Sequence, residues 1–251
     1  MRKKIRIRYK GKINPVTNAD KKTERYLIKK LSELGVFGFL CEENTYKNIK
    51  KDVWVIDPID GTVNYTHGLN KWAVSISLVT NGKTELAVTY NPSDNEMFSA
   101  LSGKGAFLNG RRIRVSNIRT TVKALLATGF PYYVWEKPER TIKLFRKFLS
   151  SAQGIRRYGS ATIDMAYVAC GRFDGFWEEG LYPWDISAGK LLIEEAGGKV
   201  TDYRGGKIET GEGYFTADRS TDRPVDRTLL SSNGLLHRKM LDIINCERKR
   251  K

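Results

Sequence analysis

The order of apolar and polar positions predicts the elements of the first part of the chain. Alternation over residues 5–9 is typical of a half-exposed strand. Apolar residues at helical spacing follow residue 19 until Gly35, which predicts one helix. Continuous apolar runs over residues 37–41 and 53–56 predict buried strands.

The following stretch predicts a mostly antiparallel sheet. Residues 72–79 and 84–90 are strand-like, and the Asn81-Gly82 pair between them is a strong signal for a tight hairpin turn. A further short strand is expected near residues 96–100.

A second half opens near residues 120–128 and mixes helices with strands. The helices are expected at residues 139–150, after Ser160, from Asp185 to the Gly197-Gly198 pair, and after Gly234. The strands are expected at residues 173–178, 199–202, 213–217 and 228–231. No internal repeat or low-complexity linker is visible, and a chain of 251 residues can form one domain or two subdomains. We expect an α+β subdomain over residues 1–120 and an α/β one over residues 121–251.

Composition limits the class of protein. A hydrophobic fraction of 40% with five tryptophans favours a packed core over disorder. No apolar run approaches the ~18 residues that span a bilayer. The basic start lacks the apolar region of a secretory signal, and three scattered cysteines suggest a reducing compartment. We therefore expect a cytoplasmic protein that does not bind membranes.

The formal net charge of +16 has three readings. It is compatible with a nucleic-acid surface, with attraction of anionic substrates, or with the abundance of Lys and Arg found in some thermophilic proteins. No RNA- or DNA-binding module is visible, so nucleic acid is not the expected main partner.

Two carboxylates close the buried run at residues 53–56. Asp57 and Asp60 lie three residues apart in a tight corner, where they repel each other and where burial increases the repulsion. A hard divalent cation with oxygen ligands is the natural species to hold between them. The alternative is a plain turn, with Asp60 or Thr62 as a helix N-cap.

The residues around the two aspartates support a site for a phosphate beside the metal. Pro58 stiffens the corner, and Gly61 lets a ligand approach the main chain closely. A helix that begins at Thr62 would add an N-terminus that favours an anion. Metal on one side and phosphate on the other is the layout of a metal-assisted phosphatase.

Residues 57–65 match D-P-[IL]-D-G-T-x-N-[FY] and so resemble the first signature of the inositol monophosphatase family. Residues 184–198 match its second signature, W-D-x-[AS]-[AS]-G-x-x-[IL]-x-x-E-A-G-G, and residues 16–20 match V-T-x-[AS]-D. The resemblance covers nearly the whole chain. It departs from the family at the start, because only 13 residues precede Asn14 where members usually carry a long helix.

The resemblance implies an α+β fold, the layered α-β-α-β-α sandwich of the sugar-phosphatase superfamily, with the site between two subdomains. It implies two or three Mg²⁺ ions held by Glu42, Asp57, the Ile59 carbonyl, Asp60 and Asp185. The implied catalytic residues are Glu42, Thr62 and, as a support for Thr62, Asp20. The implied substrate-binding residues are Asp60, Gly61, Thr62, Ser160, Ala161, Glu178 and Asp185.

Several positions keep a simpler interpretation. Asp20, Ser160 and Asp185 are all suited to capping a helix. Glu43 is the alternative to Glu42, because consecutive strand residues face opposite sides. The Arg156-Arg157 pair is suited to a carboxylate, to a second phosphate or to a partner subunit.

The expected function is Mg²⁺-dependent hydrolysis of a small phosphate monoester by a metal-activated water, with inositol monophosphate, fructose 1,6-bisphosphate or both as substrate. Asn64-Tyr65 differs from the Lys-Glu-Phe usual in related adenosine phosphatases, which argues against those substrates. The alternatives are a histidinol-phosphate phosphatase, non-enzymatic binding to RNA or a transcription complex, and a purely structural metal site. The family also suggests a homodimer and inhibition by Li⁺.

Overall fold

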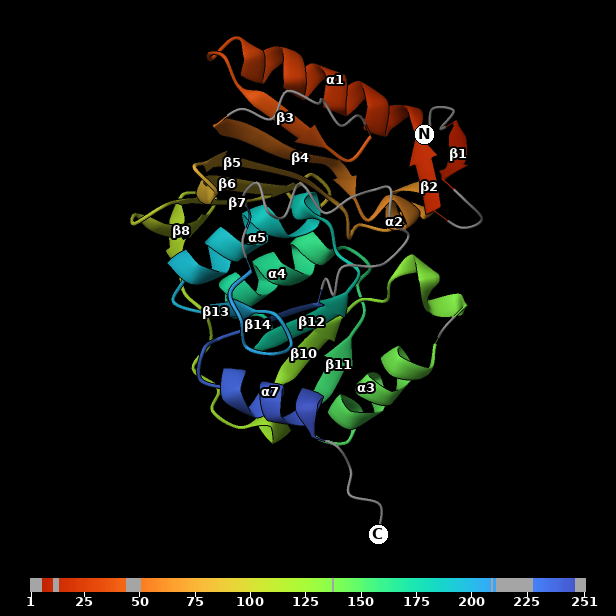
Figure 1. Cartoon of the computed structure of the whole chain (residues 1–251), viewed down its shortest axis with the longest axis vertical. Coiled ribbons are helices and arrows are strands. Elements are labelled where there is room, and N and C mark those ends of the chain that lie inside the picture. The colour runs from red at the N-terminus through yellow and green to blue at the C-terminus, as the bar shows by residue number, and fades with distance from the viewer. Residues whose placement is uncertain are drawn as a thin grey trace.

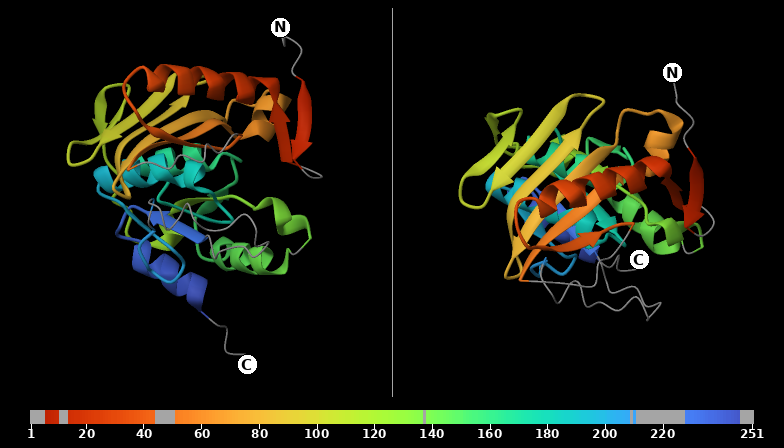
Figure 2. Two further views of the ribbon diagram at one scale, coloured as in Figure 1. Left: turned by 45° about the horizontal axis from the view of Figure 1, so that its top comes forward. Right: turned by 90° about the horizontal axis from the view of Figure 1, so that it is seen from above.

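The computed structural model describes residues 6–10, 14–43, 51–136, 138–208, 210 and 228–246. These residues form five layers, in which helices and sheets alternate (Figures 1 and 2). The outer helix α1 (Asn18–Ser32) covers a seven-stranded sheet, and α4 (Ala161–Ala169) with α5 (Pro183–Glu195) covers its other face. A five-stranded sheet follows, and α3 (Glu139–Leu149) and α7 (His237–Asn245) close the stack. The predicted α-β-α-β-α sandwich is confirmed.

The seven-stranded sheet comes from the first half of the chain and is antiparallel except between its first two strands. Asn81 and Gly82 both have positive φ and make the expected hairpin turn. The final two strands of the sheet were not among the predicted ones. In spatial order the strands are β3 (Gly38–Cys41), β4 (Asp52–Asp60), β5 (Ala73–Thr80), β6 (Lys83–Asn91), β7 (Glu96–Leu101), β8 (Gly105–Leu108) and β9 (Arg111–Ile113).

The five-stranded sheet comes from the second half and is mixed, because β14 runs antiparallel to both of its neighbours while the other strands share one direction. The expected strand at residues 213–217 lies outside the described residues. In spatial order the strands are β11 (Gly154–Arg156), β10 (Leu125–Thr128), β12 (Gly175–Glu179), β14 (Thr228–Ser232) and β13 (Lys199–Thr201).

A short ribbon and three short helices complete the described part. β1 (Ile7–Lys10) pairs with β2 (Asn14–Thr17), which leads directly into α1. The short helices are α2 (Thr62–His67), η1 (Thr121–Lys123) and η2 (Tyr132–Trp135). Among the described residues, no helix is long and apolar enough to cross a membrane.

The two central helices are largely buried, and this explains their weakly patterned sequences. Every residue of α4 is buried, and α5 contacts strands of both sheets. A helix between two sheets has little solvent-facing surface, so its sequence shows little amphipathic pattern. The helices approach each other closely at Gly189, where an added Cβ would lie 2.7 Å from the Met165 Cβ atom.

We therefore expect Gly189→Val to lower the thermal unfolding midpoint, because overpacking a tight core costs about 1–3 kcal/mol or more. Differential scanning calorimetry measures the effect. Lys190→Ala is the control, since that partly exposed side chain lies next to Gly189 in the sequence and pairs with Glu194 at the next helical turn. Equal midpoints for wild type and Gly189→Val would show that the two helices are not packed at this distance.

Candidate metal and substrate site

An irregularity in β4 turns two aspartates toward the same edge of the sheet. Asp57 pairs with Ser75 and Asp60 with Ala73, so β4 holds two residues where β5 holds one. In a regular strand, residues three apart point to opposite faces, whereas a bulge reorients them. The Asp57 Oδ1 atom accepts the Ile59 N–H at 3.0 Å, which stabilises the bulge.

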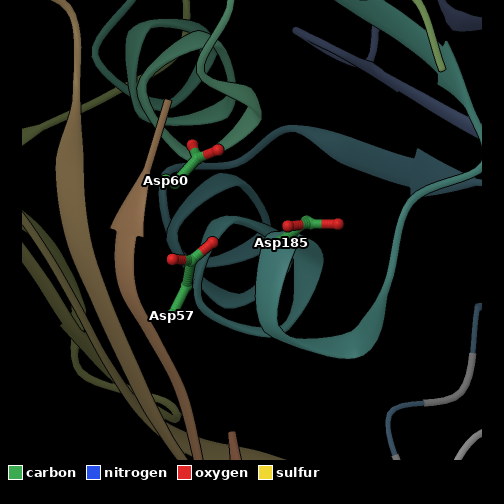
Figure 3. Close-up of side chains that lie close together, drawn as sticks. All are labelled: Asp57, Asp60 and Asp185. Carbon is green, nitrogen blue, oxygen red and sulfur yellow. The ribbon is translucent and has the colours of Figure 1, made fainter. Parts of the chain in front are cut away.

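A third carboxylate comes from the far end of the chain. Asp185 lies in the first turn of α5, and its Oδ2 accepts the Tyr182 N–H at 2.6 Å. Oxygen atoms of Asp57, Asp60 and Asp185 all lie within 4.8 Å of one another (Figure 3). Burial raises the pKa of all three, and repulsion within the group adds to the shift for Asp57 and Asp185. Such a group fits a hard cation.

Of the two neighbouring acids Glu42 and Glu43, Glu42 is the one that interacts electrostatically with this cluster. Parallel pairing sets Cys41 opposite Ile56, and the Glu42 N–H continues the ladder to the Ile56 carbonyl at 3.2 Å. The charge of Glu42 raises the pKa of both Asp57 and Asp185. Glu43 instead donates its backbone N–H to the buried Glu24 carboxylate. The arrangement favours Glu42, whose role as a ligand stays a prediction.

Asp20 combines the two roles that were considered for it. The N-cap of α1 is Thr17, so the expectation that Asp20 caps the helix is wrong in detail. Asp20 is the third residue of the helix, and its Oδ2 accepts the Thr17 N–H at 2.8 Å in a capping box. Its Oδ1 lies 3.5 Å from the Thr62 hydroxyl, at the outer limit of a hydrogen bond. The same hydroxyl donates to the Ile59 carbonyl at 3.0 Å.

Gly61 is required by both backbone shape and space. Its φ is +82°, and an added Cβ would lie 2.9 Å from the Lys71 carbonyl and 3.1 Å from the Ser160 Cβ. The backbone at the start of α2 therefore lies directly against the Gly159-Ser160 turn.

Asp60 connects the start of α4 to the bulge in β4. Its Oδ2 accepts the Ser160 hydroxyl at 2.6 Å, and the Thr162 N–H and hydroxyl at 2.7 Å each. Ser160 is also the N-cap of α4, as expected, and Ala161 is the first residue of that helix. Thr162 was not predicted to take part. Its only sequence signal is its place at the second position of a helix with a serine cap.

Glu178 comes from β12 of the second sheet. It is half-buried, and an added Cβ at Gly129 would lie 2.0 Å from its Oε2 atom. Burial raises the pKa of Glu178 to about 8, Asp60 adds to the shift, and Arg157 opposes it. Asp164 on α4 was also missed by sequence reasoning, and burial and Glu178 raise its pKa well above the usual range. Neither of its carboxylate oxygens has a hydrogen-bond partner among the described residues.

Comparison with known proteins agrees with the resemblance seen in the sequence. The model of the inositol monophosphatase family matches residues 1–246. An inositol-1-monophosphatase of Rhizobium meliloti is 42% identical over 207 residues, which are 80% of this chain and 77% of the relative. The Nus factor SuhB of Escherichia coli is 44% identical over 200 residues, which are 78% of this chain and 75% of the relative.

Solved structures agree with this match. The extragenic suppressor protein suhB from Bartonella henselae superimposes with a TM-score of 0.84 at 36% identity, over 96% of this chain and 88% of that one. A layered sandwich with a carboxylate cluster at its centre defines a class of metal-dependent phosphatases. This chain belongs to the inositol monophosphatase family and is a phosphatase of that family.

The raised pKa of Glu178 predicts a pH-dependent stability. Between its unfolded value of 4.5 and its folded value of about 8, the folded state binds the extra proton. The free energy of unfolding contributed by this group therefore falls as pH rises through that window. We expect wild type to lose more stability than Glu178→Gln between pH 5 and pH 8.5, measured by urea unfolding with a chelator present. A parallel pH dependence in the two proteins would contradict the shift.

Proposed function

We propose that the protein is a Mg²⁺-dependent phosphomonoesterase that acts on inositol monophosphate, fructose 1,6-bisphosphate or both. The observation that carries this proposal is the convergence of Asp57, Asp60 and Asp185 within 4.8 Å of one another. These come from two segments more than a hundred residues apart in the sequence.

The donor set fits Mg²⁺. All the candidate ligands are hard oxygen atoms. Burial raises the pKa of the three aspartates, and neighbouring carboxylates add to the shift for Asp57 and Asp185. The residues that would hold two or three ions are Glu42, Asp57, the Ile59 carbonyl, Asp60 and Asp185. When bound, the ions would lower the pKa of a water and stabilise the charge on the leaving oxygen.

The residues of the chain itself position the reaction. The N–H groups of Gly61 and Thr62 bind the phosphate, and Glu42 with the Thr62 hydroxyl orients the water that attacks phosphorus in line. Asp20 holds Thr62 in place. Ser160 and Ala161 line the pocket, and Glu178 with Asp185 accepts hydrogen bonds from the substrate hydroxyls. Each of these roles is part of the proposal.

The name of the Rhizobium relative supports an inositol phosphate as the substrate. Histidinol phosphate remains the alternative substrate. Phosphate release with Mg²⁺ across a panel of sugar, inositol, amino-alcohol and nucleotide phosphates will rank these candidates. A homodimer and inhibition by Li⁺ stay predictions.

Asp57→Asn and Asp185→Asn are expected to reduce Mg²⁺-dependent phosphate release roughly a thousandfold or more, because each removes a charged metal ligand. A chelator should have the same effect on wild type. Both variants should unfold at or above the wild-type temperature when Mg²⁺ is absent, since each relieves repulsion. Turnover near the wild-type rate in either variant would reject this site.

A second candidate is a nucleic-acid-associated role, which the name of the SuhB relatives suggests. The outer face of α1 favours it, because Lys21, Lys22, Arg25 and Lys29 are exposed. At the C-terminal end of α1, Lys30 forms an ion pair with Glu33. A surface of this kind attracts phosphate backbones.

This second candidate predicts that a Lys22→Glu, Arg25→Glu double variant loses RNA binding but keeps phosphate release. An electrophoretic shift titrated with salt measures the first property. Binding that vanishes at ~150 mM salt is nonspecific electrostatics and would count against the role.

A further inference from the structure

Arg156 and Arg157 are adjacent but their side chains go different ways. Arg156 ends β11, and its Nη1 donates to the carbonyl of its own neighbour Ile155 at 3.1 Å. The Arg157 guanidinium carbon lies 5.8 Å from the centre of the Phe130 ring. The same guanidinium lies over Gly159, where an added Cβ would come within 2.4 Å of its Nη1 atom.

Gly159 lies between Arg157 and the corner at Gly61 and Thr62 that is proposed to bind the scissile phosphate. Its carbonyl lies 3.2 Å from the Cβ position of Gly61, and the next residue, Ser160, donates to Asp60 at 2.6 Å. Burial raises the pKa of Glu178 and that of Tyr132 on η2, and the charge of Arg157 opposes both shifts. The guanidinium therefore lies at the edge of the site, between the phosphate corner and the acid that faces the substrate alcohol.

Arg157 has no carboxylate within ion-pair distance among the residues that the structure describes, and it is exposed. Other arginines beside carboxylates in this half do form pairs, namely Arg140 with Glu179 at 3.1 Å and Arg172 with Glu96. Phe130 and Gly159 lie against the planar guanidinium. Its N–H groups donate no hydrogen bond to another described residue, and a fork of this kind is suited to an oxyanion.

We propose that Arg157 binds a second phosphate group of the substrate, so that bisphosphates are preferred over monophosphates of the same alcohol. This inference rests on the proposed phosphatase function. The scissile phosphate lies on the far side of Gly159, beside the carboxylate cluster and its ions. A phosphate on another carbon of the alcohol extends past Glu178 and meets the guanidinium fork in bidentate fashion.

The test compares fructose 1,6-bisphosphate with fructose 1-phosphate, since the two differ only in the second phosphate. For wild type with Mg²⁺ we expect a KM that is at least tenfold lower for the bisphosphate. Arg157→Ala should raise that KM roughly 10- to 100-fold and change the KM for fructose 1-phosphate less than twofold. Arg157→Lys should have a KM for the bisphosphate between those of wild type and Arg157→Ala, because a point charge replaces the two-pronged guanidinium. Arg156→Ala is the matched control and should change neither value.

The outcomes separate this inference from the proposed function. No phosphate release from any substrate in the panel would reject the phosphatase proposal. The role of Arg157 can then still be tested, because calorimetry with Mg²⁺ present compares the affinity of wild type and Arg157→Ala for the bisphosphate. Equal binding by wild type and Arg157→Ala would overturn the inference. A KM that rises equally for both substrates would also overturn it, since Arg157 would then act on the scissile phosphate. A changed sedimentation coefficient in Arg157→Ala would assign the residue to a partner subunit instead.

Discussion

Repulsion among buried carboxylates is the constraint around which this molecule is built. Asp57, Asp60 and Asp185 are brought closer together than their charges favour, and burial raises the pKa of each. Backbone N–H groups and hydroxyls supply part of the compensation, chiefly through Ser160 and Thr162 on Asp60. The remainder calls for positive charge, which is why the cluster is suited to cations and, through them, to phosphate. Stability and function therefore oppose each other at this point in the fold.

Much of the architecture could be predicted because its signals are local. The Asn81-Gly82 turn, the apolar run before Asp57 and the glycines after α5 each specify a backbone shape within a few residues. β11 escaped prediction because a three-residue edge strand has too few positions to show a period. β8 and β9 escaped because closely spaced glycine turns hid the short strands between them.

The site was predictable only in part, for a physical reason. Signature residues identified the aspartates, but which atoms meet depends on packing between distant segments. The contact of Thr162 with Asp60 joins residues 102 positions apart, and no local pattern reports it. The sequence also could not predict where the Arg156 and Arg157 side chains point. Arg156 donates to the Ile155 carbonyl, whereas Arg157 lies against the Phe130 ring and Gly159. Asp164 looked like an ordinary helical residue until α4 proved to be buried on all sides.

The order in which these residues occur along the chain has a consequence for synthesis. The bulge that carries Asp57 and Asp60 leaves the ribosome early, whereas Asp185 belongs to α5, which ends at Glu195. A nascent chain therefore exposes two repelling acids for more than a hundred residues of translation before their counterpart emerges. Polypeptides that stop short of α5 lack Asp185, so the cluster of three carboxylates forms only after α5 has been made.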